Sequence, residues 1–203
     1  MSNINKIVPV IAVLLLFTFN LVSAEPYRVD TSGAHASINF KIKHLGYSWL
    51  TGRFNTFAGT FNFDENKPEN SKVSITVKTA SIDTAHALRD RHLRGAKYLN
   101  VNKYPEANFV TTSYKPVSKT SGVLQGNFQL HGVTRPVSMT INEVGAGKDP
   151  WGGFRRGYET SFKIRLHDYG IKHDLGQASE ELELTIYLEG IQDPSFSEIL
   201  NQK

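Results

Sequence analysis

Apolar and polar residues alternate along most of the chain. Ile38, Phe40 and Ile42, for example, are each separated by one polar residue. This period of two is typical of a half-buried antiparallel strand. It recurs in runs at 27–29, 72–78, 124–130, 137–141, 158–166 and 182–188, and we also expect strands at the Phe-rich run 54–63 and at 108–114. The pattern predicts about eight or nine short strands, and the stretch 35–64 is read as two of them joined by the turn at 44–48.

One segment breaks this alternation and favours a helix. Asp83 or Thr84 can cap its start, and residues 85–94 contain good helix formers without Gly or Pro. Gly95 then ends it. We expect one short, strongly basic helix here.

A second irregular segment, 143–156, is rich in Gly and carries Trp151 and Phe154. We expect a long loop at a functional rim, because such loops often carry function.

These elements predict an all-β fold with one helical insertion. A flat sheet would leave two long edges unpaired, so closure is favoured, and a barrel of about eight strands can hold one small apolar ligand. Alternation alone agrees equally well with a two-sheet sandwich.

The first 24 residues have the pattern of a cleaved secretory signal. Lys6 precedes the apolar run from Ile7 to Phe19, and small residues precede the expected cleavage site between Ala24 and Glu25. The run is shorter than a bilayer-spanning helix, although an uncleaved anchor is the alternative. Residues 25–203 then form one exported domain.

Composition narrows the class of partner. The chain has no Cys, so its core must hold the fold without disulfides, although export would permit them. Without Lys6, 22 Lys and Arg face 19 Asp and Glu, with the signs interspersed. A net positive charge this small does not favour nucleic acid as a partner.

The sequence carries no pattern of catalytic or metal-binding residues. There is no GxSxG, no Cys nucleophile and no phosphate loop. Its seven His residues show no paired spacing such as HExxH. We therefore expect neither catalytic residues nor a metal or other cofactor.

Several segments together resemble the YceI family of periplasmic proteins, often described as polyisoprenoid-binding. The resemblance covers essentially the whole mature chain and includes a segment typical of the Gram-negative subgroup. It is carried by HASINFKIKHLGYSWLTGRF (35–54), SIDTAHALRDRHLRGAKYLN (81–100), KYPEANF (103–109), GNFQLHGVTRPVSM (126–139) and DPWGGFRRGYE (149–159). It implies an extended, eight-stranded, lipocalin-like antiparallel barrel, often dimeric, whose interior holds a long isoprenoid chain such as a quinone tail. It implies no catalytic residues.

A lipid tail needs an apolar wall that excludes water and makes no directional hydrogen bonds, and the alternating apolar residues can supply such a wall. A filled core needs the same residues, and the resemblance favours the ligand channel. The candidate lining residues are Phe40, Ile42, Phe61, Phe63, Phe128, Leu130, Met139, Phe162, Ile164 and Leu184. Strands of about eight residues at ~3.3 Å each make a wall of roughly 26 Å, so a long polyprenyl tail must bend or protrude.

We expect the head group near the mouth, where Arg suits a phosphate or a polar quinone ring. The alternative for the basic helix is a solvated face. The candidate rim residues are His44, Trp49, Arg89, His92, Arg94 and Trp151. The resulting hypothesis is a periplasmic carrier of a polyprenyl or ubiquinone-like lipid, monomeric or homodimeric, that transiently contacts a membrane or membrane protein. The alternatives are a periplasmic enzyme acting on a lipid or a small stress metabolite, and a stress-induced structural protein with a filled barrel.

Overall fold

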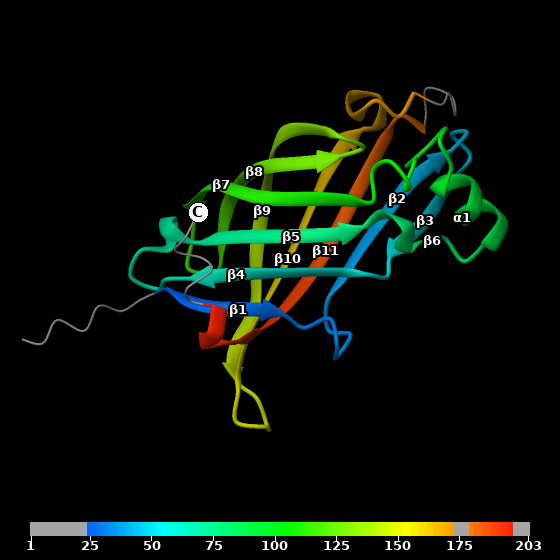
Figure 1. Cartoon of the computed structure of the whole chain (residues 1–203). Helices are drawn as coiled ribbons and strands as arrows, with labels where there is room; N and C mark the ends of the chain where they lie inside the picture. The colour runs from blue at the N-terminus through cyan, green and yellow to red at the C-terminus, as the bar shows by residue number, and fades with distance from the viewer. Residues whose placement is uncertain (1–23, 173–178, 197–203) are drawn as a thin grey trace, which may run out of the picture.

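The alternating runs form antiparallel strands in the computed structural model, which describes residues 24–172 and 179–196 (Figure 1). Eleven strands lie within these residues: β1 (Glu25–Val29), β2 (Ser37–His44), β3 (Ser48–Phe54), β4 (Phe57–Phe63), β5 (Lys72–Lys78), β6 (Ile82–Asp83), β7 (Glu106–Pro116), β8 (Ser121–Leu130), β9 (Val133–Lys148), β10 (Phe154–Arg165) and β11 (Glu181–Gln192).

Eight of the strands close into a barrel, as expected, and the sandwich alternative is wrong. β1 pairs with both β4 and β11, which completes the ring β1-β4-β5-β7-β8-β9-β10-β11. The remaining strands extend this ring on one side, because the first half of β11 pairs with β2, and β3 and β6 follow in order. Strands β10 and β11 have 12 residues each, which is roughly 40 Å at ~3.3 Å per residue and longer than we expected.

The stretch 35–64 forms three strands rather than the two that we expected. β2 and β3 make a hairpin, but the chain turns at Asn55 and Thr56, and β4 crosses to pair with β1 and β5. Ser81 fixes this turn, since its carbonyl accepts the N–H of Asn55 at 3.1 Å and its hydroxyl accepts the N–H of Thr56 at 3.0 Å. The strand ends here because of contacts with a residue 25 positions away in the sequence, which local alternation could not reveal.

The expected long loop at 143–156 is also wrong. β9 continues to Lys148 and β10 begins at Phe154, and the two pair directly at that point. Asp149 holds the short turn between them by accepting the N–H groups of Trp151 and Gly153 at 3.0 and 2.7 Å. The glycines therefore lie in a long hairpin that projects at the bottom of Figure 1.

The expected helix is α1 (Ala87–Arg94), at the end of the barrel next to β3 and β6 (Figure 1). Its cap is His86, whose Nδ1 accepts the N–H of Arg89 at 3.2 Å, and not Asp83 or Thr84. The 3-10 helices in the described residues are η1 (Pro68–Asn70), η2 (Thr79–Ser81), η3 (Leu166–Tyr169) and η5 (Pro194–Phe196). Among the described residues, no helix is long and apolar enough to cross a membrane.

The predicted signal segment lies outside the described residues, apart from Ala24. β1 begins at Glu25, the residue at which we expect the mature chain to start. The cleavage itself stays a prediction.

Candidate functional site

The inner faces of the strands enclose an apolar channel of about 190 Å³. Among its lining residues, Asn108 and Thr160 carry amide or hydroxyl groups, and these bond elsewhere. The Asn108 amide donates to Gln129 at 3.2 Å, and the Thr160 hydroxyl donates to the carbonyl of Thr140 at 2.7 Å. Apart from Tyr98, the other lining side chains are aliphatic groups, phenyl groups and the thioether of Met139. The wall therefore offers contact without directional hydrogen bonds, which suits an apolar guest.

Eight of the ten predicted lining residues lie on this channel: Phe40, Ile42, Phe128, Leu130, Met139, Phe162, Ile164 and Leu184. All of them except the partly buried Phe128 are buried core residues, and Phe128 and Phe162 meet edge to face with their ring centroids 5.7 Å apart. They come from β2, β8, β9, β10 and β11, so the channel is built by strands far apart in the sequence. Contact with a ligand stays a prediction for each of them.

Phe61 and Phe63 were expected on the channel wall, but neither lies among its lining residues. Phe61 stacks on Tyr27 with centroids 4.8 Å apart and meets Tyr158 edge-on at 5.5 Å. Phe63 packs under the guanidinium of Arg156 at 4.1 Å. Both side chains therefore belong to a packed layer that closes one end of the barrel, here called the base.

The base also buries a charged group beside these rings. Arg156 is 5% exposed, and it donates to Glu143 at 2.6 Å and to Glu65 at 3.3 Å. Burial raises the pKa of the Tyr27 hydroxyl to about 12, although Arg156 acts in the opposite direction. The Tyr158 hydroxyl has its pKa raised for the same reason. The base therefore combines packed aromatic rings with a buried guanidinium.

The size of the channel restricts the shape of a guest. Drug-sized ligands occupy pockets of about 300–1,000 Å³, which is more than the 190 Å³ enclosed here. The lining nevertheless involves every strand except β1 and β4. A slender chain that runs between the strands fits this space better than a compact ring system.

At the end opposite the base, α1 and the residues after it complete the wall. Leu93, Tyr98 and Leu99 contribute to the lining, which the strand pattern did not predict. The helix carries two leucines, and Leu88 is exposed while Leu93 lies on the channel, so its composition is a weak signal of an inward face. The described residues at this end therefore cover the channel with one short helix and its loop.

The predicted head-group arginines of α1 are held by the protein itself. Arg94 donates to the carbonyls of Ala80 and Ile82 at 2.6 and 2.7 Å. Arg89 donates to the hydroxyl and carbonyl of Thr84, both at 2.7 Å. These bonds fasten the helix to the barrel, so the two guanidinium groups hold the end of the channel in place.

The other predicted rim residues lie at two separate places. His44 and Trp49 lie on the β2–β3 hairpin near α1, and His92 is exposed in the last turn of that helix. Trp151 is 76% exposed in the β9–β10 turn, which projects away from α1 (Figure 1). The structure therefore does not bring the six rim candidates together.

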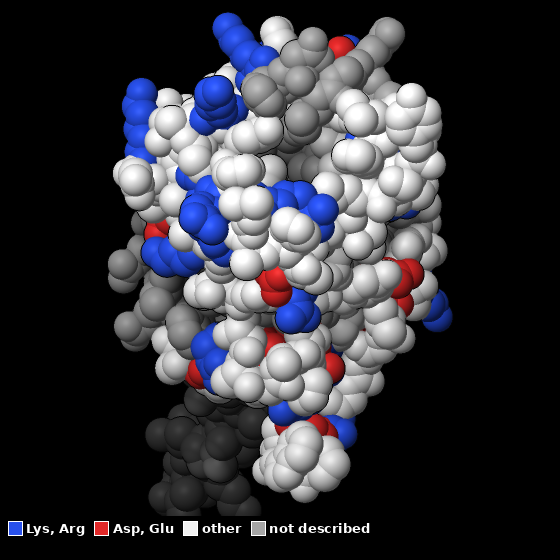
Figure 2. Space-filling model, turned by 90° about the vertical axis from the view of Figure 1, so that its right-hand side faces the viewer, with Lys and Arg blue, Asp and Glu red and all other residues white. Residues whose placement is uncertain are grey.

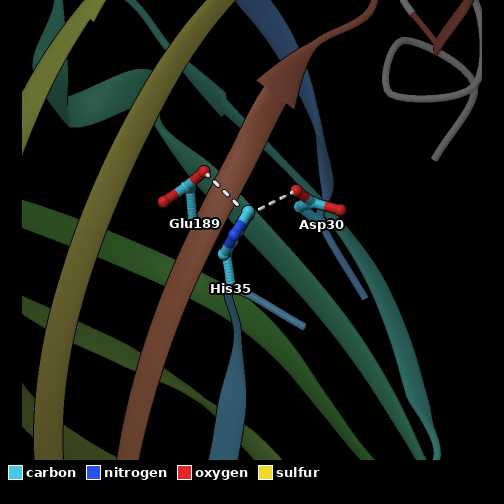
Figure 3. A group of neighbouring side chains, drawn as sticks. All are labelled: Asp30, His35 and Glu189. Atoms are coloured by element: carbon cyan, nitrogen blue, oxygen red, sulfur yellow. Dashed lines mark hydrogen bonds and ion pairs between the residues drawn. The ribbon is translucent and has the colours of Figure 1, made fainter. Parts of the chain in front are cut away.

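Asp30, His35 and Glu189 form a cluster that sequence spacing did not predict (Figure 3). His35 Nδ1 lies 3.0 Å from Asp30 Oδ2 and 3.5 Å from Glu189 Oε1, a donor set that could suit a metal ion. However, the Nη1 atom of Arg155 contacts the same two carboxylate oxygens at 2.7 and 2.5 Å. The guanidinium thus already supplies the positive charge that a metal would bring.

Arg155 also ties the surrounding segments together. Its Nε donates to Asp149 in the β9–β10 turn at 2.9 Å, and its guanidinium lies 5.3 Å from the ring of Trp151. Burial raises the pKa of the Asp30 carboxyl, but bonds from Arg155, Gly33 and His35 outweigh this and hold the pKa well below its usual range. We therefore assign this cluster a structural role.

The comparison with protein families gives one match, to the family described as YceI-like domain, over residues 27–190. Among curated sequences, the chain is 51% identical to a UPF0312 protein of Pseudomonas aeruginosa over 177 residues, which cover 87% of this chain and 92% of that protein. It is also 51% identical to Protein YceI of Salmonella arizonae, over 88% of this chain and 93% of that protein.

Solved structures share the same barrel. Burkholderia cenocepacia BcnA matches with a TM-score of 0.70 at 17% identity, over 79% of this chain and 98% of that one. The YceI protein of Campylobacter jejuni matches with a TM-score of 0.67 at 25% identity, over 75% and 91%. A polyisoprenoid binding domain from Saccharophagus degradans matches with a TM-score of 0.62 at 14% identity, over 82% and 98%.

Proposed function

The chain belongs to the YceI-like family, and we propose that it is a periplasmic carrier that binds a long-chain isoprenoid or a similar amphiphilic lipid inside its barrel. The observation that carries this proposal is the apolar channel, in which the polar groups of Asn108 and Thr160 are directed to other partners. The polyisoprenoid binding domain with the same fold supports it.

The shape of the channel favours a linear tail as the buried part. Burial of an apolar chain contributes roughly 25 cal/mol per Å² before ordering costs, and it needs no covalent chemistry. The base is filled by Tyr27, Phe61 and Tyr158, which supports a head group toward the other end, bounded by α1. The guest in this proposal is a polyprenyl or ubiquinone-like lipid with its head group near that end.

The family and the fold favour a binding protein over an enzyme. We further propose that the protein acts as a monomer or homodimer and contacts a membrane, or a protein within it, when it exchanges its lipid. The lipid is held as a ligand, and we expect no other cofactor.

The test is an equilibrium binding experiment with delipidated protein. Polyprenol, ubiquinone and a water-soluble metabolite mixture are each incubated with it, and the protein fraction is separated by gel filtration and extracted. We expect polyprenol or ubiquinone to co-elute and to be recovered chemically unchanged. Recovery of a converted product would instead support the enzyme alternative, and the absence of any bound lipid would support a filled barrel.

A further inference from the structure

The turn between β2 and β3 exposes three large apolar side chains within five residues. Leu45, Tyr47 and Trp49 are 54%, 88% and 54% exposed, and together they are here called the apolar tip. Single exposed apolar residues are ordinary on protein surfaces, whereas a contiguous group marks a binding surface. The apolar tip is therefore a candidate binding surface.

Positive charge is concentrated around the apolar tip. Residues 41–53 and 86–97 together contain seven Lys or Arg and one Asp, and the remaining 178 residues of the chain contain 16 Lys or Arg and 18 Asp or Glu. The one acid within them, Asp90, is buried and accepts bonds from Thr84. Acids outside the two segments pair with two of the seven cations, Glu183 with Lys41 at 3.0 Å and Asp83 with Arg53 at 4.0 Å, and the other five have no ion pair among the described residues. Figure 2 shows Lys and Arg side chains gathered in the middle and upper part of the face that carries α1, with fewer Asp and Glu among them.

The two basic segments are neighbours in the fold. β6 pairs with β3 through Ile82 and Phe54, and α1 is fastened to β6 by the bond from Arg94 to the carbonyl of Ile82. The inward side chains of both segments, including Leu50 and Leu93, line the channel. The charged outer surface therefore belongs to the same wall that bounds this end of the channel.

We propose that the apolar tip and the basic surface beside it dock on an anionic lipid bilayer. Tyr and Trp rings are suited to the headgroup level of a membrane, since one part of each is apolar and the other polar. Lys and Arg side chains close to them are attracted to anionic headgroups. The Nζ atoms of Lys41 and Lys43 lie 5.2 and 5.7 Å from the Trp49 ring, so apolar contact and charge are combined in one place.

This contact turns the α1 end of the channel toward the membrane, the source and destination of an isoprenoid. Its use in lipid exchange rests on the proposed function, but the docking itself does not. The side chains of the apolar tip lie outside the channel lining. Variants of the tip therefore separate docking from lipid binding.

The experiment is co-sedimentation of the mature protein with phosphatidylglycerol vesicles and with phosphatidylcholine vesicles. We expect binding to the anionic vesicles alone, weakened by added salt because the charges are exposed. The double variants Tyr47→Ser/Trp49→Ser and Lys43→Glu/Arg91→Glu should each bind on the order of tenfold more weakly. The matched control is Trp151→Ser, an equally exposed aromatic residue away from α1, which should bind as the wild type does.

Three results would overturn the proposal. The first is equal binding to both kinds of vesicle. The second is binding to neither, which would indicate a protein partner for the apolar tip. The third is a loss of vesicle binding in the Trp151→Ser control as large as in the tip variants. Mass spectrometry of the lipid carried by each variant keeps the two proposals apart. Vesicle binding by a protein that carries no lipid would refute the proposed function alone, and lipid in the channel without vesicle binding would refute the docking alone.

Discussion

A phenyl ring introduced at Ala107 should compete directly with the ligand. Ala107 is 5% exposed on β7, opposite Val77 of β5, and it lines the channel. The strand backbones around it are fixed by their ladders, so the new ring of Ala107→Phe has to enter the 190 Å³ of enclosed space. This substitution therefore separates an open channel from a filled core.

The expected loss of lipid affinity follows from the space that the ring takes. If the ring excludes one five-carbon isoprene unit, at about 0.8 kcal/mol per buried CH₂-sized group, the gross loss is about 4 kcal/mol. Ordering costs that are avoided reduce it. We therefore expect a loss of about 2–4 kcal/mol, on the order of 30- to 1,000-fold in Kd.

The stability of the lipid-free protein gives a second readout. Overpacking of a filled core costs about 1–3 kcal/mol, which lowers Tm by about 2–12 °C for a domain of this size. A ring that enters free space costs less, and we expect Tm to stay within about 2 °C of the wild type.

The assay is a titration of delipidated protein with a short isoprenoid alcohol such as farnesol, followed by thermal melts. The matched control is Val110→Phe, because Val110 lies on the same strand with its side chain 51% exposed. It should bind farnesol as the wild type does. Unchanged farnesol binding by Ala107→Phe, together with a large drop in its Tm, would refute the open channel.

Three further predictions concern the parts that hold the barrel closed. Arg155→Met should lower the unfolding free energy by about 3 kcal/mol in a thermal melt, because it leaves the carboxylate of Asp30 buried without its cation. The control Lys163→Met removes an exposed ion pair and should leave Tm unchanged. Since the pKa of Asp30 is depressed, its contribution is present above the ordinary carboxyl pKa and is lost as pH falls through the lower folded value. The difference in unfolding free energy between wild type and Asp30→Asn should thus be constant from about pH 7 to 5 and shrink below about pH 4, and a constant difference at all pH values would contradict it. A Cβ at Gly190 would clash with an aromatic ring of the base, so Gly190→Val should lower Tm by several degrees, while Gly145→Ala, with open space around it, should not.

Local pattern predicts the fold class because the side-chain period of two is a property of each strand alone. The alternation at Ile38, Phe40 and Ile42 identified β2 correctly, and the unpaired edges of a flat sheet favoured the closure that β1 provides. The helix was expected for the same kind of reason, from its composition and its end at Gly95.

Features that depend on distant contacts were missed. Nothing local to Phe61 separates it from Phe162, since both alternate within Phe-rich strands. Their different surroundings arise because Phe61 meets Tyr27 and Tyr158 at the base, whereas Phe162 lies on the channel. The glycines of the β9–β10 hairpin favour a loop locally, but backbone pairing across the hairpin makes these residues part of two strands.

The cluster around Arg155 shows the same limit for side-chain chemistry. Asp30 and Arg155 are 125 positions apart, and no spacing rule joins them. The charge of each residue was visible in the sequence, whereas their contact depends on the barrel closing β1 onto β11.

Native mass spectrometry of the protein purified from the cells that make it tests the central claim most directly. The account predicts a complex whose mass exceeds that of the polypeptide by one isoprenoid lipid, and whose lipid is released when the protein unfolds. A homogeneous, lipid-free mass under conditions that preserve non-covalent complexes would contradict it.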